Sequence, residues 1–531
     1  MYETYLSAFH ACIKEAKPEA VMGAYNRVNG EPCCGSKTLL TDILRNEWHF
    51  KGHVVSDCFA LRDFYQHHMV TKDAVESAAL AMNNGCDLNC GHMYLHLSEA
   101  VSRGMVSESR LRAAVTNLYT TRLKLGMEQD KELPDNPYDK IPYSVVDSVE
   151  MREFNESVSE KTFVLLKNNG ILPLNREKLR TIAVIGPNAD SRRALVGNYE
   201  GTASRYITIS EGIQDYVGDS VRVLVSEGCD LYKENWKKNR IAEVREMAEM
   251  GDVVILCLGL DAGIEGEQGD AGNDFASGDK PDLKLPGEQN QILEAALDSG
   301  KPVVVLLLSG SALAVNTAQE RAAAVMQCWY PGAQGGRAVA RILFGEVSPQ
   351  GHLPVTFYKS TEELPEFTDY SMKNRTYRYM KQEALYPFGY GLTYTSFSYD
   401  NMECGAGRQT FQKMKAGEKI QLPVSVRVCN TGNFDCAETV QVYVKALCDG
   451  SPNPQLKGFG KVFLKAGEEK QVTVWLSEEA FELYDENGQI YFTDEGYTVY
   501  IGGSQPDTRS RTLTGTIPLR QNLWSEVVNN T

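Results

Sequence analysis

The carboxylate of Asp57 stands at the end of an apolar run, in the stretch "GHVVSDCFALRDF" from Gly52 to Phe64. Burying a lone ionised carboxylate is costly, so Asp57 needs an exposed strand end, a partner or a chemical role. The alternative is that Asp57 caps the helical segment that follows it. In parallel α/β domains, functional groups gather at the carboxyl ends of strands. Tyr25 and Asn26 hold that place on the preceding apolar run and Asp87 lies in the next one, so these residues are candidates for chemistry.

A second set of carboxylates follows the apolar run "VVILCLGL", in the stretch "DAGIEGEQGDAGNDFASGDKPD". Its acidic residues, set against the single Lys280, are Asp261, Glu265, Glu267, Asp270, Asp274, Asp279 and Asp282. A solvated acidic surface is one interpretation, and a weak calcium site is another, although the spacing does not match the helix–loop–helix calcium pattern. The third interpretation is a glycine-flanked arm that carries a carboxylate to the site of another domain. Two carboxylates from separate elements would suit glycoside hydrolysis, in which one attacks the anomeric carbon and the other protonates the leaving oxygen. The residues alone leave all three interpretations open.

The composition favours a polar, uncharged substrate. The chain has 531 residues, 42 % of them hydrophobic and 23 % charged, with a formal net charge of −16. An acidic protein repels phosphate backbones and anionic membrane surfaces, so we expect neither nucleic acid nor membrane as a partner. The most apolar run, "VVVLLLSGSALAV" from Val303, is too short to span a bilayer. No basic segment followed by an apolar one opens the chain, so no secretory signal is visible.

The 13 cysteines lie mostly alone inside apolar runs. The close pairs are Cys33 with Cys34 and Cys86 with Cys90, and neither has the spacing of a zinc site. We therefore expect buried free thiols, a reducing compartment and a cytoplasmic location.

The stretch "VIGPNAD" lacks the three-glycine fingerprint of dinucleotide-binding domains, and no ribose-binding acid is placed to support one. No cofactor and no metal are expected.

Three patterns divide the chain. The first alternates helical stretches such as "AVESAALAMNNG" with short strands such as "AVMGAYN", "GHVVSD" and "CDLNC", which predicts parallel strands with crossover helices. Three strands cannot close a barrel, and the chain opens within a helical pattern, so we expect the first part of this domain to be missing. The second pattern has β-branched runs separated by helical segments, which predicts a parallel or mixed α/β sheet. The third is all strand, with alternating polarity and recurring turn signals, and predicts an antiparallel β-sandwich.

Several motifs, in order along the chain, resemble glycoside hydrolase family 3. They are "VMGAYNRVNGEPCCGSKTLLTDILRNEWHFKGHVVSD", "LLKNNGILPL", "LPVTFY", "YPFGYGLTYTSF" and "QLKGFGKVFLKAGEEKQVTVWL". The resemblance covers nearly the whole chain. It implies a multidomain α/β plus all-β protein: the C-terminal part of a (β/α)8 TIM barrel at 1–125, a linker at 126–157, an α/β sandwich at 158–370, a linker at 371–404 and a fibronectin-type-III-like β-sandwich at 405–520.

The resemblance also implies roles for particular residues. Asp57 matches the nucleophile that forms the glycosyl-enzyme, and Glu267 in "IEGEQGD" is our choice for the acid/base, with Glu265 the competing candidate. Three further residues match positions that contact the sugar: Met22, Tyr25 and, in the second domain, Ser204.

The chain departs from the family pattern in three places. Asp270 is followed by Ala271 where the family usually has Arg, and Phe59 stands where a small residue is common. The early barrel strands, which in the family supply a substrate-binding Asp, an Arg and a Lys–His pair, are not in the sequence.

The activity implied is that of a retaining exo-β-glycosidase acting by double displacement. We expect release of terminal β-D-xylose from oligosaccharides or glycosides, with β-D-glucose next, while α-L-arabinofuranosidase activity occurs on similar chains. The substrate would be the main partner, and a homodimer is compatible with the resemblance. The alternative is a catalytically impaired, incomplete carbohydrate-binding fragment of such an enzyme.

Overall fold

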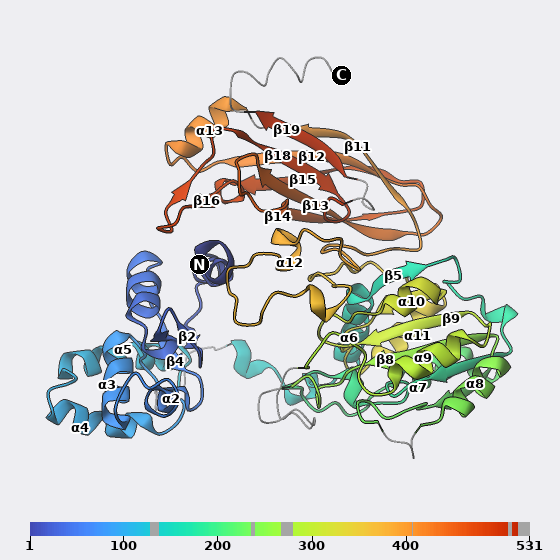
Figure 1. The fold of residues 1–531 in the computed structure, drawn as a ribbon, viewed down its shortest axis with the longest axis horizontal. Coiled ribbons are helices and arrows are strands. Elements are labelled where there is room, and N and C mark those ends of the chain that lie inside the picture. Colours follow the sequence, from blue (N-terminus) through green and yellow to red (C-terminus); the bar gives the residue numbers. More distant parts are fainter. Residues whose placement is uncertain (128–136, 235–238, 267–279, 406, 508–511, 519–531) are drawn as a thin grey trace. The chain divides into compact units, whose positions relative to one another are not determined.

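The computed structural model describes residues 1–127, 137–234, 239–266, 280–405, 407–507 and 512–518 (Figure 1). It divides into two compact units, which are described separately. The first comprises Met1–Pro142 with Tyr484–Gln489, and the second comprises Tyr143–Leu483 with Ile490–Thr531.

The first unit is built on two parallel strands. Strand β1 (Ala20–Gly23) pairs with β4 (His53–Ser56), so that Gly23 lies opposite Ser56. A single parallel bridge between Val55 and Leu88 adds a third segment beside β4, where a short strand is predicted. The carboxyl ends of these segments therefore lie together, as the alternating pattern of strands and helices predicts. The barrel to which they would belong stays a prediction.

Helices surround this pair of strands, and side chains cap several of them. Asp73 accepts a hydrogen bond from the Glu76 amide at the start of α3, and Ser107 caps α5 in the same way. The helical segments are Tyr2–Ala16, which includes α1 (Ser7–Ala11), the π-helical Lys37–Glu47, α2 (Ala60–Gln66), α3 (Ala74–Asn84), α4 (Leu97–Ser102) and α5 (Glu108–Lys124). A small β-hairpin joins β2 (Arg27–Val28) to β3 (Glu31–Pro32).

The second unit begins with a six-stranded sheet in the order β5-β10-β9-β8-β6-β7. Strand β5 is antiparallel to β10 and the other neighbours are parallel, which confirms the predicted mixed α/β sheet. The strands are β5 (Val164–Asn168), β6 (Thr181–Ile185), β7 (Arg222–Ser226), β8 (Val253–Gly259), β9 (Val303–Leu308) and β10 (Ala324–Gln327).

Alternate side chains of β8 enter two different cores, as the two-residue period of a strand requires. Leu256 packs in the core that includes residues of α8, α9 and α10, and Cys257 packs in the core that includes residues of α7 and α11. These helices are α7 (Ile209–Val217), α8 (Ile241–Met250), α9 (Gln289–Leu297), α10 (Asn316–Arg321) and α11 (Gly335–Leu343), with α6 (Val149–Thr162) before the sheet. Among the described residues, no helix has both the length and the apolar character needed to cross a membrane.

The C-terminal part is a sandwich of two antiparallel sheets, which confirms the predicted all-β domain. The first sheet has the order β11-β12-β15 and the second has the order β14-β13-β18-β19. Strand β11 starts at Phe397, inside the stretch predicted as a linker. The strands are β11 (Phe397–Cys404), β12 (Gln421–Asn430), β13 (Cys436–Ala446), β14 (Gln455–Leu464), β15 (Glu469–Ser477), β18 (Gly496–Gly502) and β19 (Leu513–Pro518). Short pieces accompany them: α12 (Thr376–Tyr379), α13 (Arg408–Lys415), β16 (Leu483–Tyr484) and β17 (Ile490–Tyr491).

The sandwich contains a buried carboxylate whose ionisation opposes folding. Glu438 is 5 % exposed, and its Oε1 accepts a hydrogen bond of 2.5 Å from the Tyr399 hydroxyl. Burial raises the pKa of Glu438 from 4.5 to about 7, although the Tyr399 hydrogen bond and the charge of Lys461 oppose the shift. Because the raised pKa makes the folded state hold this proton longer than the unfolded chain does, Glu438 lowers stability as the pH rises from 4.5 to about 7.

We expect Glu438→Gln to stabilise the sandwich at pH 8 by about 3 kcal/mol, the free-energy equivalent of this pKa rise, and to change little at pH 4. Gln keeps an oxygen for the Tyr399 hydroxyl but carries no charge. The measurement is the unfolding transition of this domain at the two pH values, with Glu469→Gln on the exposed surface of β15 as the matched control. A pH dependence that is the same in Glu438→Gln and the unaltered protein would contradict the assignment.

Candidate active site

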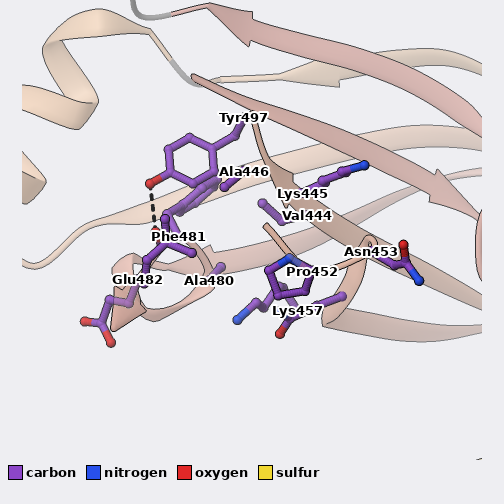
Figure 2. A pocket seen from close by; sticks show the side chains of 12 residues that line it. Val444, Lys445, Ala446, Pro452, Asn453, Lys457, Ala480, Phe481, Glu482 and Tyr497 are labelled. Carbon is purple, nitrogen blue, oxygen red and sulfur yellow. Dashed lines mark hydrogen bonds between the residues drawn. The ribbon is translucent and has the colours of Figure 1, made fainter. Parts of the chain in front are cut away.

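A pocket in the β-sandwich does not provide the pair of carboxylates that the predicted chemistry needs (Figure 2). Its lining is mixed, and Glu482 is the one carboxylate in it. At its edge, Tyr497 donates a hydrogen bond of 2.8 Å to the carbonyl of Phe481. The lining residues are Val444, Lys445, Ala446, Pro452, Asn453, Gln455, Lys457, Ala480, Phe481, Glu482, Leu483 and Tyr497. The candidate carboxylates lie instead at the carboxyl ends of the parallel strands β4 and β8.

Asp57 lies directly after β4 and is half-buried. Its amide donates a hydrogen bond of 3.0 Å to the carbonyl of Gly23, which extends the β1–β4 ladder to this residue. Its Oδ1 accepts a hydrogen bond of 2.7 Å from the Cys58 amide, which orients the carboxylate. The helix α2 begins only at Ala60, with Phe59 in the capping position and no side-chain cap. Asp57 is therefore not the cap of α2, and its carboxylate stands at a strand end, where it can meet a ligand.

The pairing of β1 with β4 brings the other two predicted residues of this unit to the same edge. Met22 lies opposite Val55 in the ladder and is 58 % exposed. Tyr25 follows β1 and donates a hydrogen bond of 2.6 Å from its hydroxyl to the carbonyl of Cys58, the residue after Asp57. The structure thus places Met22, Tyr25 and Asp57 together, while their roles toward a sugar stay predictions.

The structure corrects the prediction that the cysteines are all free thiols. Cys58 and Cys90, which are 32 residues apart, form a disulfide with their Cα atoms 4.5 Å from each other. Each follows one of two adjacent parallel segments, since Val55 pairs with Leu88, so the two side chains meet at the strand ends. Cys86, the sequence neighbour of Cys90, is fully buried in the core instead. Because disulfides persist mainly in oxidising compartments, the cytoplasmic location loses this support and stays a prediction.

Phe59 lies two residues after Asp57 in a left-handed conformation, with φ of 65°. A side chain in this region is strained, and such strain persists where surrounding contacts enforce it. The Phe59 amide donates to the carbonyl of Cys90, and the centroid of the Phe59 ring lies 5.5 Å from the Arg62 guanidinium carbon and 5.9 Å from that of the His92 ring. The ring is nevertheless 46 % exposed, so an exposed aromatic side chain stands two residues after Asp57, where the resemblance predicts a small residue.

Asp87, the candidate from the third apolar run, has a structural role. Its carboxylate is fully buried and forms ion pairs of 2.7 Å with Arg45 and 2.9 Å with Arg110. The Val54 amide also donates to it, at 3.0 Å. Because these contacts occupy both of its oxygens, the Asp87 carboxylate is not available to bind a substrate. It joins β4 to the surrounding helices.

In the second unit, the acidic segment starts at the carboxyl end of β8. Here β8 and β6 are neighbours whose following connections leave in different directions, an arrangement that often creates a ligand-binding crevice. Asp261 is 7 % exposed, accepts a hydrogen bond from the Gly263 amide and lies 3.6 Å from Arg193. The Glu265 amide donates to the carbonyl of Asp261, which closes one turn. Glu267 lies outside the described residues, so its place stays a prediction.

Glu265 has its carboxylate engaged within its own unit. Oε2 accepts hydrogen bonds from the Tyr330 hydroxyl at 2.6 Å and from the Gly310 amide at 2.7 Å. Burial, and then the negative charge of Glu265, raise the pKa of Tyr330 well above its ordinary value, so the phenol stays a donor. The sequence does not reveal these partners, which lie 45 and 65 residues further along the chain.

Lys280 is the other group that the sequence leaves without a role. Burial lowers its pKa from 10.5 to about 8, against the opposing charges of Glu265 and Asp282, and its ammonium donates to the carbonyl of Ala312. A lone lysine among seven acidic residues is a signal that could have identified it.

Ser204 is held by a small polar cluster. Its hydroxyl accepts a hydrogen bond of 2.9 Å from Arg152, and its amide donates to Asp147 at 2.6 Å. Hydrogen bonds from Ser204 and from Arg152 lower the pKa of Asp147 to about 2. Ser204 therefore has a fixed position, while its contact with a sugar stays a prediction.

A mixed α/β core with a C-terminal β-sandwich, and a half-buried carboxylate at a parallel strand end, fit the class of glycoside hydrolases. Models of the glycosyl hydrolase family 3 N-terminal and C-terminal domains match residues 1–121 and 163–394, and a fibronectin type III-like domain matches residues 438–505. The chain belongs to glycosyl hydrolase family 3.

Relatives agree with this membership. A xylan 1,4-β-xylosidase of Xylanibacter ruminicola is 31 % identical over 97 % of this chain and 75 % of its own length. A solved β-glucosidase from Erythrobacter marinus is 30 % identical with a TM-score of 0.84, covering 96 % of this chain and 69 % of that one. A solved family 3 exo-β-xylosidase in complex with a xylobiose aziridine activity-based probe is 26 % identical with a TM-score of 0.84, covering 97 % and 67 %.

Proposed function

We propose that this chain is a retaining exo-β-glycosidase that releases a terminal β-D-xylose from the non-reducing end of oligosaccharides or glycosides, with β-D-glucose the next substrate. The observation that carries the proposal is the half-buried Asp57 carboxylate at the end of β4, oriented by the Cys58 amide, in a family 3 chain. Xylose comes first because the Xylanibacter relative and the probe-bound structure are both named as β-xylosidases. The partner in this proposal is the carbohydrate, and the homodimer stays a prediction.

In the proposed mechanism, Asp57 attacks the anomeric carbon while Glu267 protonates the leaving oxygen, which gives a glycosyl-enzyme. Glu267 then removes a proton from water, which attacks the same carbon and releases Asp57. Two inversions leave the anomeric configuration retained. Met22 and Tyr25 contact the sugar beside Asp57, and Ser204 contributes from the second unit.

The contacts of Glu265 favour Glu267 as the acid/base. A residue that protonates the leaving oxygen must present its carboxyl to the substrate, whereas the Oε2 atom of Glu265 already accepts two hydrogen bonds. Glu265 is therefore the weaker candidate for the acid/base.

The test is hydrolysis of nitrophenyl β-D-xyloside and β-D-glucoside, with the first free sugar followed by NMR at early times. We expect turnover of both, faster for the xyloside, with the β anomer appearing first and the α anomer only through mutarotation. The α anomer as first product would contradict the retaining mechanism, and faster glucoside turnover would reverse the substrate order. If neither is hydrolysed, the carbohydrate-binding alternative replaces the enzyme.

A further inference from the structure

We propose that Asn89 is a positioning residue for the nucleophile: its side chain ties the end of β4 to the segment 88–90 and so holds the Asp57 carboxylate where it can attack the anomeric carbon. The inference rests on the proposed function, because it takes Asp57 as the nucleophile. The residues that carry it all belong to the first unit, and the family resemblance gives Asn89 no role.

The first support is that the backbone around Asp57 sets the position of its carboxylate. Its Oδ1 accepts a hydrogen bond of 2.7 Å from the Cys58 amide, and the Asp57 amide donates to the carbonyl of Gly23. A shift of residues 56–58 away from this geometry would therefore move the carboxylate with it. Contacts that fix these residues also aim Asp57.

The second support is the set of contacts made by the buried side chain of Asn89. Its Nδ2 donates a hydrogen bond of 3.0 Å to the hydroxyl of Ser56, the buried residue immediately before Asp57. Its Oδ1 accepts a hydrogen bond of 2.9 Å from the amide of Met93, the first residue of a short helical segment. The side-chain amide of Asn89 thus joins the residue before the nucleophile to a different element.

The third support is that the backbone of the same segment contacts residues on both sides of Asp57. The Ser56 amide donates to the carbonyl of Leu88 at 2.9 Å, and the Ser56 hydroxyl accepts a hydrogen bond from the Cys90 amide at 3.0 Å. On the other side of Asp57, the Phe59 amide donates to the carbonyl of Cys90 at 2.8 Å. This segment therefore holds the chain both before and after the nucleophile.

Two side-chain contacts strengthen this attachment, one on each side of the nucleophile. After Asp57, the disulfide joins Cys58 to Cys90 covalently. Before Asp57, Asn89 supplies the side-chain hydrogen bond to Ser56. A buried polar group whose hydrogen bonds are satisfied rigidifies its surroundings, so the Asn89 side chain restrains a point of the chain that the disulfide does not reach.

Such a restraint matters for catalysis because a misplacement of about 1 Å can reduce a rate by about 100-fold. In this proposal the Asn89 side chain does not contact the substrate and acts on Asp57 through Ser56. We therefore expect its loss to slow the attack on the anomeric carbon more than it weakens substrate binding.

The experiment compares Asn89→Ala, Ser56→Ala and the double variant with the unaltered protein. Ser56→Ala removes the same hydrogen bond from the other side and leaves the contact of Asn89 with Met93 in place. Asn84→Ala is the matched control, because the half-buried Asn84 also donates from its side chain to a partner, the carbonyl of Gly35, but at the end of α3.

Two kinetic readouts separate positioning from stability. The first is kcat and KM on phenyl β-D-xyloside, whose poor leaving group makes the attack of Asp57 limit turnover. The second is the rate and the final extent of covalent labelling by a xylobiose aziridine probe, which follows the nucleophile without the second step of the reaction. Hydrogen exchange of the Cys90 amide reports on the attachment, and thermal unfolding reports on stability.

In Asn89→Ala we expect kcat and the labelling rate to fall roughly 5- to 50-fold, with KM nearly unchanged and labelling still complete at long times. Ser56→Ala, which also removes the acceptor of the Cys90 amide, should slow both rates at least as much. The double variant should lose no more than Ser56→Ala alone, because both substitutions remove one hydrogen bond. The Cys90 amide should exchange faster in Asn89→Ala, while Asn84→Ala should match the unaltered protein in kcat, labelling rate and Cys90 exchange.

An unchanged labelling rate in Asn89→Ala overturns the positioning role, and so do additive losses in the double variant. A purely structural role would lower the unfolding temperature and the final extent of labelling, while the labelling rate of the folded protein stayed the same. If Asn89→Ala does not fold, Ser56→Ala decides the question with the same readouts. Failure of the proposed function is distinguished by the unaltered protein itself, which would then hydrolyse neither xyloside nor glucoside and remain unlabelled. Faster Cys90 exchange in Asn89→Ala would then still show the attachment, without a catalytic role.

Discussion

Replacing Asp57 with Asn should lower kcat by on the order of 10³-fold or more, because the amide cannot form the glycosyl-enzyme. Asn is nearly isosteric and its side-chain oxygen can still accept the hydrogen bond from the Cys58 amide, so the fold should be kept. The measurement is kcat on an aryl β-xyloside together with thermal unfolding. Asp42→Asn is the matched control, because Asp42 forms an exposed ion pair with Lys37. Turnover that persists within a few-fold in Asp57→Asn would remove Asp57 as nucleophile.

Covalent labelling gives an independent check of the same residue. A xylobiose aziridine probe of the kind bound by the solved exo-β-xylosidase is expected to add its mass to the peptide that carries Asp57. The Asp57→Asn variant should remain unlabelled, and Asp42→Asn should label like the unaltered protein. Mass on a different peptide would identify another nucleophile.

The strands that carry the candidate site could be predicted from the sequence because their local signals agree. The run before Asp57 and the run before Asp261 are apolar and rich in β-branched residues, and each ends abruptly at a polar residue. Parallel pairing then follows from the alternation with helices, and it brings Tyr25 and Met22 beside Asp57. At "CDLNC" the sequence pattern covers only a few residues and predicts a short strand. The structure has a single bridge there, between Leu88 and Val55.

The contacts that decide which carboxylate does what could not be predicted, because they join residues far apart in the chain. Asp87 carries the same local signal as Asp57, but Arg45 and Arg110, which bury and pair it, come from other elements. The sequence does not distinguish Glu265 from Glu267, because both are glutamates in the same acidic stretch. The fold brings Tyr330 and Gly310 into contact with Glu265. Burial and the contacts of each side chain therefore decide which carboxylates have a structural role and which can meet a ligand. A short stretch of sequence determines neither of them.

The disulfide shows the same limit. Cys86 and Cys90 are close in sequence, yet Cys86 points into the core, and Cys90 meets Cys58 because two parallel segments end side by side. Sequence spacing identifies cysteine pairs only where a local motif fixes the geometry. Here the pairing depends on the register between β4 and the segment at Leu88.

Replacing Glu267 with Ala should impair turnover in a way that depends on the leaving group. An acid/base acts twice, first protonating the leaving oxygen and then activating water, and such catalysis contributes about 10²- to 10⁴-fold. Substrates with poor leaving groups should therefore suffer most, because good ones depart without protonation. For good leaving groups the second step limits turnover, and azide, which needs no base, should restore the rate and give a β-glycosyl azide.

The control is Glu265→Ala, which keeps the Glu267 carboxylate. We expect no azide rescue in this variant, because the negative charge of Glu267 repels azide from the position of the attacking water. Leaving-group dependence on aryl β-xylosides, azide rescue and the anomeric form of the azide product are the three measurements. If the two variants exchange their behaviours, Glu265 is the acid/base, and its contacts with Tyr330 and Gly310 must open when substrate binds. If neither variant is rescued, the acid lies elsewhere in the acidic segment, and Asp270→Ala is the next variant to test. A rescue confined to Glu267→Ala would establish that Glu267, and not the Glu265 that binds Tyr330 and Gly310, performs the proton transfer.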